Sequence, residues 1–192
     1  MDKSKAKSNN YRLTTNLINQ NLEVNDFKKH TSNISVRTLQ ITLNNSFKEH
    51  LSLMRVPLKR LPEIPWESSD IKAYLEETTF LFVLFKEDGL NNRLHDVIKW
   101  KMDELTLNTY CKEVYDFAAN LVSENRLELV ATKKGVVNNL PSSSFNGIAH
   151  FRPKAQSAND KETLLNGQRI TKQGFWLNSD FLYQLLIGKQ FF

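Results

Sequence analysis

The chain of 192 residues contains one cysteine, six glycines and five prolines. The single cysteine, Cys111, excludes an internal disulfide bond and any zinc site built from cysteines. No stretch approaches the roughly 18 apolar residues of a transmembrane helix, and the N-terminus lacks the apolar core of a secretory signal. These absences predict a cytoplasmic protein with no membrane partner.

The composition is that of an ordinary soluble domain, with 40% hydrophobic and 24% charged residues. A chain of this length can bury a substantial core within one domain. Residues 1–12 begin with a polar, basic stretch, which is typical of a flexible linker or tail. We therefore expect residues 13–192 to form a single domain.

Hydrophobic periodicity predicts a mixed α/β fold. Alternating apolar residues from Ile34 to Ile41 indicate a strand, and the uninterrupted apolar run Phe80–Phe85 indicates a buried central strand, with another strand over 92–100. A helix is expected over 70–78, with Ser69 as its N-cap. The other expected segments are a helix or turn over 11–22, an irregular proline-rich stretch over 56–65, a helix over 103–124 with an apolar stripe (Leu105, Tyr110, Val114, Phe117, Ala118, Leu121), a strand over 145–152 and a helix over 179–187 capped by Ser179.

The positive charge is concentrated in residues 133–178, hereafter the basic segment. It contains seven cations and two acids, a net charge of +5, which equals the net charge of the chain; the remaining 19 cations and 19 acids balance. The cations are Lys133, Lys134, Arg152, Lys154, Lys161, Arg169 and Lys172. Such a surplus beside aromatic residues is typical of a DNA-contacting surface, although a solvated basic loop has the same composition.

Two motifs in this segment carry a resemblance to a known family. They are Arg152-Pro153-Lys154-Ala155, with Asn159 shortly after it, and the block Ile170–Asn178. Together they resemble the end of the MutH family, which contains the mismatch-repair nicking endonuclease and the type II restriction endonucleases that cut at GATC. A weaker likeness in order and spacing extends over residues 25–185. The resemblance implies a restriction-endonuclease-like mixed sheet flanked by helices.

Active members of that family hold Mg²⁺ with two carboxylates and place a lysine beside the attacking water. The matching positions here are Lys28, Ser35 and Arg37. A cation and a hydroxyl in place of the carboxylates cannot hold a hard divalent ion. The chain therefore most resembles the C-terminal, non-catalytic copy in the two-domain GATC enzymes. This resemblance implies a DNA-binding effector that needs no cofactor, with Mg²⁺ serving the catalytic MutH-like domain of the same parent enzyme.

Arg152 offers a rigid fork that suits the O6 and N7 atoms of guanine or a phosphate, and Pro153 stiffens its turn. The resemblance makes Lys154 the first choice for base readout. Gln156 and Asn159 suit adenine edges or phosphates. Backbone or minor-groove contacts are expected from Lys172 and Gln173, and a phosphate clamp from Lys133 and Lys134.

Two other functions are compatible with the sequence, and a homodimer is left open. A nuclease could use a displaced acidic site at Glu23, Asp26 or Glu49, and an assembly module could contact protein instead of DNA. His150 is as compatible with a packed strand as with DNA contact. Phe175 and Trp176 favour core positions over base stacking, and Asn178 could cap the last helix.

Overall fold

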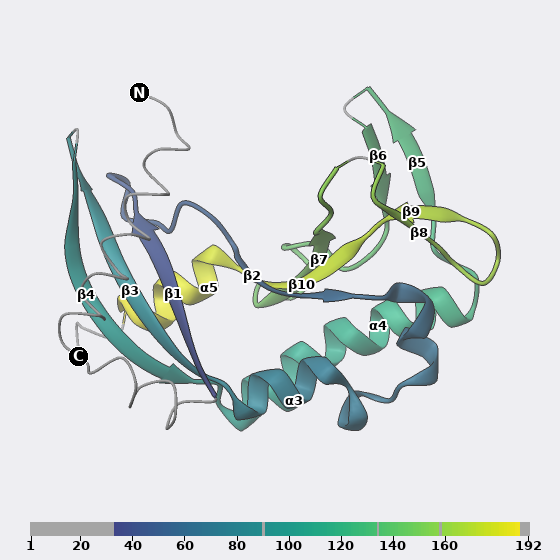
Figure 1. Ribbon diagram of the computed structural model, residues 1–192, viewed down its shortest axis with the longest axis horizontal. Coiled ribbons are helices and arrows are strands. Elements are labelled where there is room, and N and C mark those ends of the chain that lie inside the picture. Colours follow the sequence, from purple (N-terminus) through teal and green to yellow (C-terminus); the bar gives the residue numbers. More distant parts are fainter. Residues whose placement is uncertain (1–32, 90, 134, 158, 189–192) are drawn as a thin grey trace. The chain divides into compact units, whose positions relative to one another are not determined.

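The computed structural model describes residues 33–89, 91–133, 135–157 and 159–188. It divides into two compact units, one containing the described parts of Met1–Glu49 and Glu77–Lys101, and the other those of His50–Glu76 and Met102–Phe192 (Figure 1). A single domain over 13–192 stays a prediction. The tail over 1–12, the helix or turn over 11–22, and Glu23, Asp26, Lys28 and Lys134 lie outside the described residues.

The first unit contains a three-stranded sheet with the order β1-β3-β4. Its strands are β1 (Ile34–Ile41), β3 (Thr79–Asp88) and β4 (Asn91–Lys101). β3 lies in the centre, parallel to β1 and antiparallel to β4. The predictions of these strands are confirmed, including burial of the apolar run of β3, where Phe80, Phe82 and Leu84 are fully buried.

The second unit contains an antiparallel sheet with the order β2-β10-β7. Its strands are β2 (Leu51–Val56), β7 (Ala149–Pro153) and β10 (Gln173–Leu177). Two hairpins accompany it: β5 (Leu129–Thr132) with β6 (Gly135–Asn138), and β8 (Lys161–Thr163) with β9 (Arg169–Thr171). Together with the helices, these sheets confirm a mixed α/β fold.

The strand expected over 145–152 begins later than predicted, at Ala149. The side-chain oxygen of Asn146 accepts hydrogen bonds from the backbone N–H groups of Ile148 and Ala149, at 3.1 and 3.3 Å. Gly147 has a positive φ of 76°, which suits a turn. Because these contacts satisfy the backbone locally, residues before Ala149 form a turn instead of a strand.

The first helical segments follow β2. They are two short 3₁₀ helices, η1 (Leu58–Glu63) and η2 (Trp66–Ser68), and the α-helix α3 (Asp70–Glu77). The expectation of an irregular stretch over 56–65 is therefore wrong: the fixed φ of proline is compatible with a short 3₁₀ helix, and Pro62 lies inside η1. The predicted N-cap of α3 is confirmed, since Ser69 Oγ accepts the Lys72 N–H at 3.1 Å.

The long helix is partly different from its prediction. It begins with a π-helical segment, η3 (Thr106–Cys111), and continues as α4 (Lys112–Ser123), which packs on η1. The wider π turn rotates the side chains out of the phase of a regular α-helix. Leu105 and Tyr110 of the expected stripe are therefore exposed, and Phe117, in the regular helix that follows, is exposed as well. The buried face consists of Leu107, Cys111, Val114, Tyr115, Ala118, Leu121 and Val122.

The last helix, α5 (Ser179–Leu186), begins one residue after the N-cap position, which Asn178 occupies. Ser179 is therefore not the cap, and Asn178 makes no side-chain capping bond. Its backbone carbonyl accepts the Leu182 N–H at 3.1 Å, while its side chain points to other partners. Among the described residues, no helix has both the length and the apolar character needed to cross a membrane.

Candidate nucleic-acid interface

The sheet of the second unit places two arginines on one face. Arg55 of β2 and Arg152 of β7 both pair with Gly174 of the central strand β10. Residues paired across neighbouring strands lie on the same face of a sheet. Arg55 and Arg152 therefore flank a position that has no side chain of its own.

Lys154 fills the space above that glycine. A Cβ atom added to Gly174 would meet Lys154 Cβ and Cδ, and the Met54 carbonyl oxygen, at 2.8 Å each. The Lys154 chain therefore passes directly over β10, and its Nζ donates a hydrogen bond to the Leu53 carbonyl at 2.9 Å. The glycine is required because any larger residue would displace the lysine that we predict to read bases.

Arg152 is exposed and lies against an aromatic ring. Its guanidinium carbon is 5.6 Å from the centre of the Trp176 ring, within the range of a cation–π contact. The Trp176 indole N–H donates to the Arg152 carbonyl at 3.2 Å. Trp176 is half-buried, whereas Phe175 is fully buried as expected. The Trp176 ring thus packs against the Arg152 guanidinium, whose N–H donors stay exposed.

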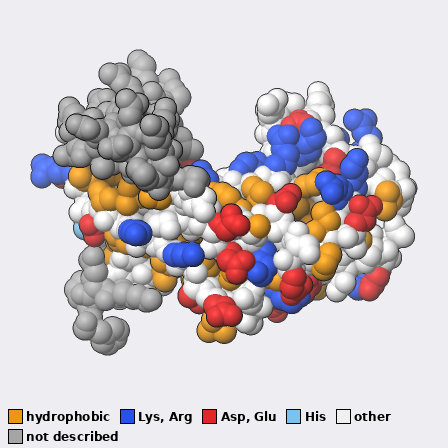
Figure 2. Space-filling model, turned by 60° about the horizontal axis from the view of Figure 1, so that its bottom comes forward, with side chains coloured by type: hydrophobic (Ala, Val, Ile, Leu, Met, Phe, Trp, Pro, Cys, Tyr) orange, Lys and Arg blue, Asp and Glu red, His pale blue; other side chains and the backbone are white. Residues whose placement is uncertain are grey.

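The β8–β9 hairpin presents further cations. Lys161 pairs with Thr171, and Arg169 pairs with Thr163, so these four side chains share one face. Lys161 and Arg169 are exposed, while Glu162 and Ile170 on the other face are half-buried and buried. Figure 2 shows Lys and Arg side chains gathered toward the right of the view, on the part of the second unit that carries the hairpins. One hairpin face thus adds positive charge.

Asp160 lies among the cations, in the connection between β7 and β8. Its side chain is 17% exposed and forms ion pairs with Lys172 Nζ at 2.5 Å and Arg55 Nη2 at 3.2 Å. The Gln156 backbone N–H donates to the same carboxylate at 3.1 Å. The hydrogen bond from Lys172 is the main reason that the pKa of Asp160 lies below its ordinary value. The carboxylate is therefore ionised at neutral pH.

The remaining predicted contacts lie in different surroundings. Gln156 and Asn159 are exposed in the β7–β8 connection, and Lys133 is exposed at the end of β5. Gln173 is 1% exposed, and its amide donates to the Thr171 carbonyl at 2.7 Å. The predicted DNA contact of Gln173 is therefore wrong, because its side chain is taken up by the protein interior.

A pair of histidines lies on the same side of the sheet as Arg152, where His150 pairs with Trp176. His150 is 2% exposed, which confirms a packed strand position, and its ring meets that of His50 edge-on at 4.7 Å between centroids. His150 Nδ1 lies 2.5 Å from Asn178 Oδ1. The amide nitrogen of the same asparagine donates a hydrogen bond to the Ser143 carbonyl. Burial, and then His50, lowers the pKa of His150 to about 4. Burial also lowers the pKa of the half-buried His50, so both rings are neutral at pH 7.

The positions that match the family's catalytic residues lie in the first unit. Ser35 and Arg37 are half-buried on β1, where they pair with Phe80 and Phe82 of β3. A hydroxyl and a guanidinium beside an apolar strand do not fit Mg²⁺, which prefers oxygen ligands with negative charge. In the ranges that the structure describes, no three His, Cys, Asp or Glu side chains gather as a metal site.

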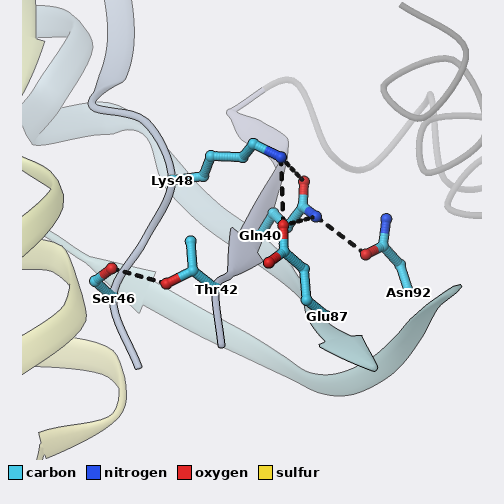
Figure 3. Close-up of polar contacts among 6 residues, drawn as sticks. All are labelled: Gln40, Thr42, Ser46, Lys48, Glu87 and Asn92. Carbon is cyan, nitrogen blue, oxygen red and sulfur yellow. Dashed lines mark hydrogen bonds and ion pairs between the residues drawn. The ribbon is translucent and has the colours of Figure 1, made fainter. Parts of the chain in front are cut away.

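A polar cluster lies near the end of β1 in this unit (Figure 3). Gln40 Nε2 donates to Glu87 Oε1 at 2.8 Å and to Asn92 Oδ1 at 3.0 Å, and Lys48 Nζ lies 3.3 Å from Glu87 Oε1. Nearby, the Thr42 and Ser46 hydroxyls are 2.9 Å apart. The carboxylate is already satisfied by an amide and an ammonium, so the cluster ties strands together.

Sequence reasoning missed two contributors to the basic face, Arg55 and Gly174. Arg55 is about a hundred residues away from the Arg-Pro-Lys motif and lies outside the basic segment. Its guanidinium Nε nevertheless donates to the Lys154 carbonyl at 3.3 Å. Only the strand order could reveal this neighbour. Asp160 is one of the two acids of the basic segment. Its position as the single acid between Lys154 and Lys161 was the signal in the sequence that could have pointed to its contacts with cations.

Comparison with known proteins finds no matching family model and no matching curated protein. The resemblance to the MutH family therefore rests on the residues of the two motifs. Their geometry is now defined: Arg152-Pro153-Lys154 leads from β7 into the connection, and Ile170–Asn178 contains most of β9 and all of β10.

Proposed function

We propose that this chain is a sequence-specific DNA-binding domain that recognises GATC in duplex DNA and acts as the allosteric effector domain of a MutH-like type II restriction endonuclease. The parent enzyme would supply a separate catalytic MutH-like domain with its Mg²⁺. On this proposal the fold is a variant of the restriction-endonuclease-like sheet. The site of action would be the cytoplasm, where the DNA lies.

The observation that carries the proposal is the row Arg55–Gly174–Arg152 with Lys154 laid across it. Three cations gather on one sheet face, and one of them is an exposed arginine supported by Trp176. A rigid guanidinium fork suits the O6 and N7 atoms of guanine, and the surrounding lysines suit phosphates. A rigid sheet lowers the entropy lost when these side chains are fixed on DNA.

The Lys154 ammonium already donates a hydrogen bond to the Leu53 carbonyl. An ammonium has three N–H donors, so it can keep this bond while donating to a base acceptor. The bond then holds the lysine in place for readout. If Lys154 instead serves the protein alone, its loss will reduce stability and leave sequence preference unchanged.

The experiment that tests the proposal is a fluorescence-anisotropy titration with a GATC duplex and a scrambled duplex at two salt concentrations. We expect tighter binding to GATC and a steep loss of affinity with salt, because phosphate contacts release counterions. Arg152→Ala and Lys154→Ala should each lower the preference for GATC about tenfold. Lys99→Ala, which removes an exposed lysine on β4 of the first unit, is the control.

Two outcomes would overturn the proposal in different directions. Equal, weak binding to both duplexes would leave a basic surface without sequence preference and would favour the assembly function, which a DNA-independent dimer would support. Mg²⁺-dependent nicking by the purified chain, lost in Glu49→Gln, would establish the nuclease function instead. Glu49 is exposed and is the acid of that alternative within the described ranges.

A further inference from the structure

We propose that Asp160 is a positioning residue for sequence recognition. It lowers the affinity of the surface for DNA of any sequence and raises the preference for the recognised sequence. This inference rests on the proposed DNA-binding function. The carboxylate shapes the β7–β8 connection, so that Arg152 and Lys154 reach base edges in a fixed arrangement. Its negative charge weakens the attraction of the same surface for phosphates.

The carboxylate joins three parts of the second unit. Lys172 reaches it from the junction between β9 and β10, Arg55 from β2, and the backbone N–H of Gln156 from within the connection. One oxygen faces Lys172, and the other is shared between Arg55 and Gln156. A local loop contact would involve its own neighbours alone, whereas this one ties the connection to two strands of the sheet.

Backbone hydrogen bonds extend the same arrangement. The Lys172 N–H donates to the Asp160 carbonyl at 3.1 Å, and the Lys154 N–H donates to the Lys172 carbonyl at 2.8 Å. The Asp160 N–H donates to the Ser157 carbonyl at 3.1 Å, which closes a turn inside the connection. Arg55 contacts both ends of the connection, through the Lys154 carbonyl and the Asp160 carboxylate. Lys154 is therefore held in position by the partners of Asp160.

The electrostatic effect of Asp160 opposes DNA binding. An ionised carboxylate paired with Arg55 and Lys172 repels phosphates and neutralises part of the field that attracts them. A surface selected for affinity alone would gain by replacing it with a neutral residue. The negative charge lowers affinity for DNA, but the contacts of Asp160 raise the preference for one sequence. They do so because ordered side chains discriminate between bases better than mobile ones.

Asp160→Asn separates the two effects, since asparagine keeps the shape and loses the charge. The probes are the GATC and scrambled duplexes in the anisotropy titration at one salt concentration. We expect affinity for the scrambled duplex to rise by a few-fold and the preference for GATC to fall about tenfold. An equal rise for both duplexes would overturn the proposal, since it would show an effect of charge alone. Unchanged binding to both would overturn it too.

Matched variants keep the result interpretable. Asp116→Asn removes a carboxylate paired with Lys112 on α4, which makes the same change of net charge outside the basic segment. It should leave the preference for GATC unchanged. Asp160→Glu keeps the charge and should recover part of the preference, because a carboxylate can still reach Lys172.

If Asp160→Asn unfolds the protein, Arg55→Gln and Lys172→Gln test the same contacts from the opposite side. Each should lower affinity for both duplexes and lower the preference for GATC about threefold or more. An unchanged preference in both variants would overturn the role of Asp160. Absence of any GATC preference in the unsubstituted protein would instead overturn the proposed function.

Discussion

Glu87 in the first compact unit and Arg152 in the second lie in contrasting surroundings. In the first, Glu87 is satisfied by Gln40 and Lys48. In the second, Arg152 stays exposed on Trp176, and Asp160 is shared by two cations. The first arrangement uses polar groups to hold strands together, whereas the second leaves a surplus of positive charge at a fixed place on a sheet. Surplus charge on a rigid support is what recognition of a polyanion requires.

Ser35 and Arg37 lie on β1 next to β3, and their side chains do not suit a metal ion. Burial of β3 depends on apolar residues such as Phe82. Substitutions of buried residues should therefore lower stability, whereas substitutions of the exposed cations of the second unit should change binding.

The largest effect is expected in the first unit. Phe82→Ala should lower the free energy of unfolding by about 3–5 kcal/mol, because it leaves a cavity beside Phe80 and Trp100. Urea denaturation followed by circular dichroism measures this change. Leu43→Ala is the control, since Leu43 is 68% exposed and should change stability by less than about 0.5 kcal/mol. Equal losses in both variants would contradict the buried position of β3.

Acid should weaken the second unit by a nearly comparable amount. His150 has a pKa of about 4 in the folded protein, below its ordinary value of 6.5, because burial disfavours the charged ring. A lowered histidine pKa contributes stability above the unfolded pKa, and that stability is lost as the pH falls from about 6.5 toward 4. The loss below pH 4 should approach about 3 kcal/mol.

Unfolding curves measured between pH 7 and pH 4 would show this loss. His150→Gln removes the titrating ring and should flatten the dependence on pH over that range, whatever its own stability at pH 7. His50 acts in the same direction, because burial lowers its pKa as well. An identical pH dependence with and without His150 would refute this account.

A smaller effect is expected on binding by the second unit. Arg152→Lys keeps the charge but removes the planar fork, so the preference for GATC should fall about tenfold, or about 1.4 kcal/mol. Affinity for the scrambled duplex should change little, because the phosphate term depends on charge. Anisotropy titration measures both affinities. A uniform loss for both duplexes would show that Arg152 contacts phosphate instead of a base.

The smallest effect should appear in stability without any change in binding. Ser69→Ala removes the cap of α3 and should cost about 1 kcal/mol. Ser68→Ala, next to it and exposed, should cost less than about 0.5 kcal/mol. Thermal denaturation compares the two variants. A changed GATC preference in Ser69→Ala would show that the cap of α3 also affects recognition by the second unit.

Several features of the chain were predictable because they depend on neighbours in the sequence. The apolar run of β3, the strand β1 and the serine cap of α3 were predicted from local patterns, and the structure confirms them. The concentration of positive charge in residues 133–178 is likewise a count along the chain. Local periodicity and charge determine which segments are buried and which stay in water.

Other features depend on contacts between distant residues. The π turn exposes Leu105, the sheet interior takes up Gln173, and strand pairing brings Arg55 to a motif about a hundred residues away. The close fit of Lys154 over Gly174 depends on the register of three strands. The sequence by itself determined the mixed α/β elements and the basic segment. Only the tertiary structure decided which cations share a face, because pairing and packing bring together residues that no local pattern links.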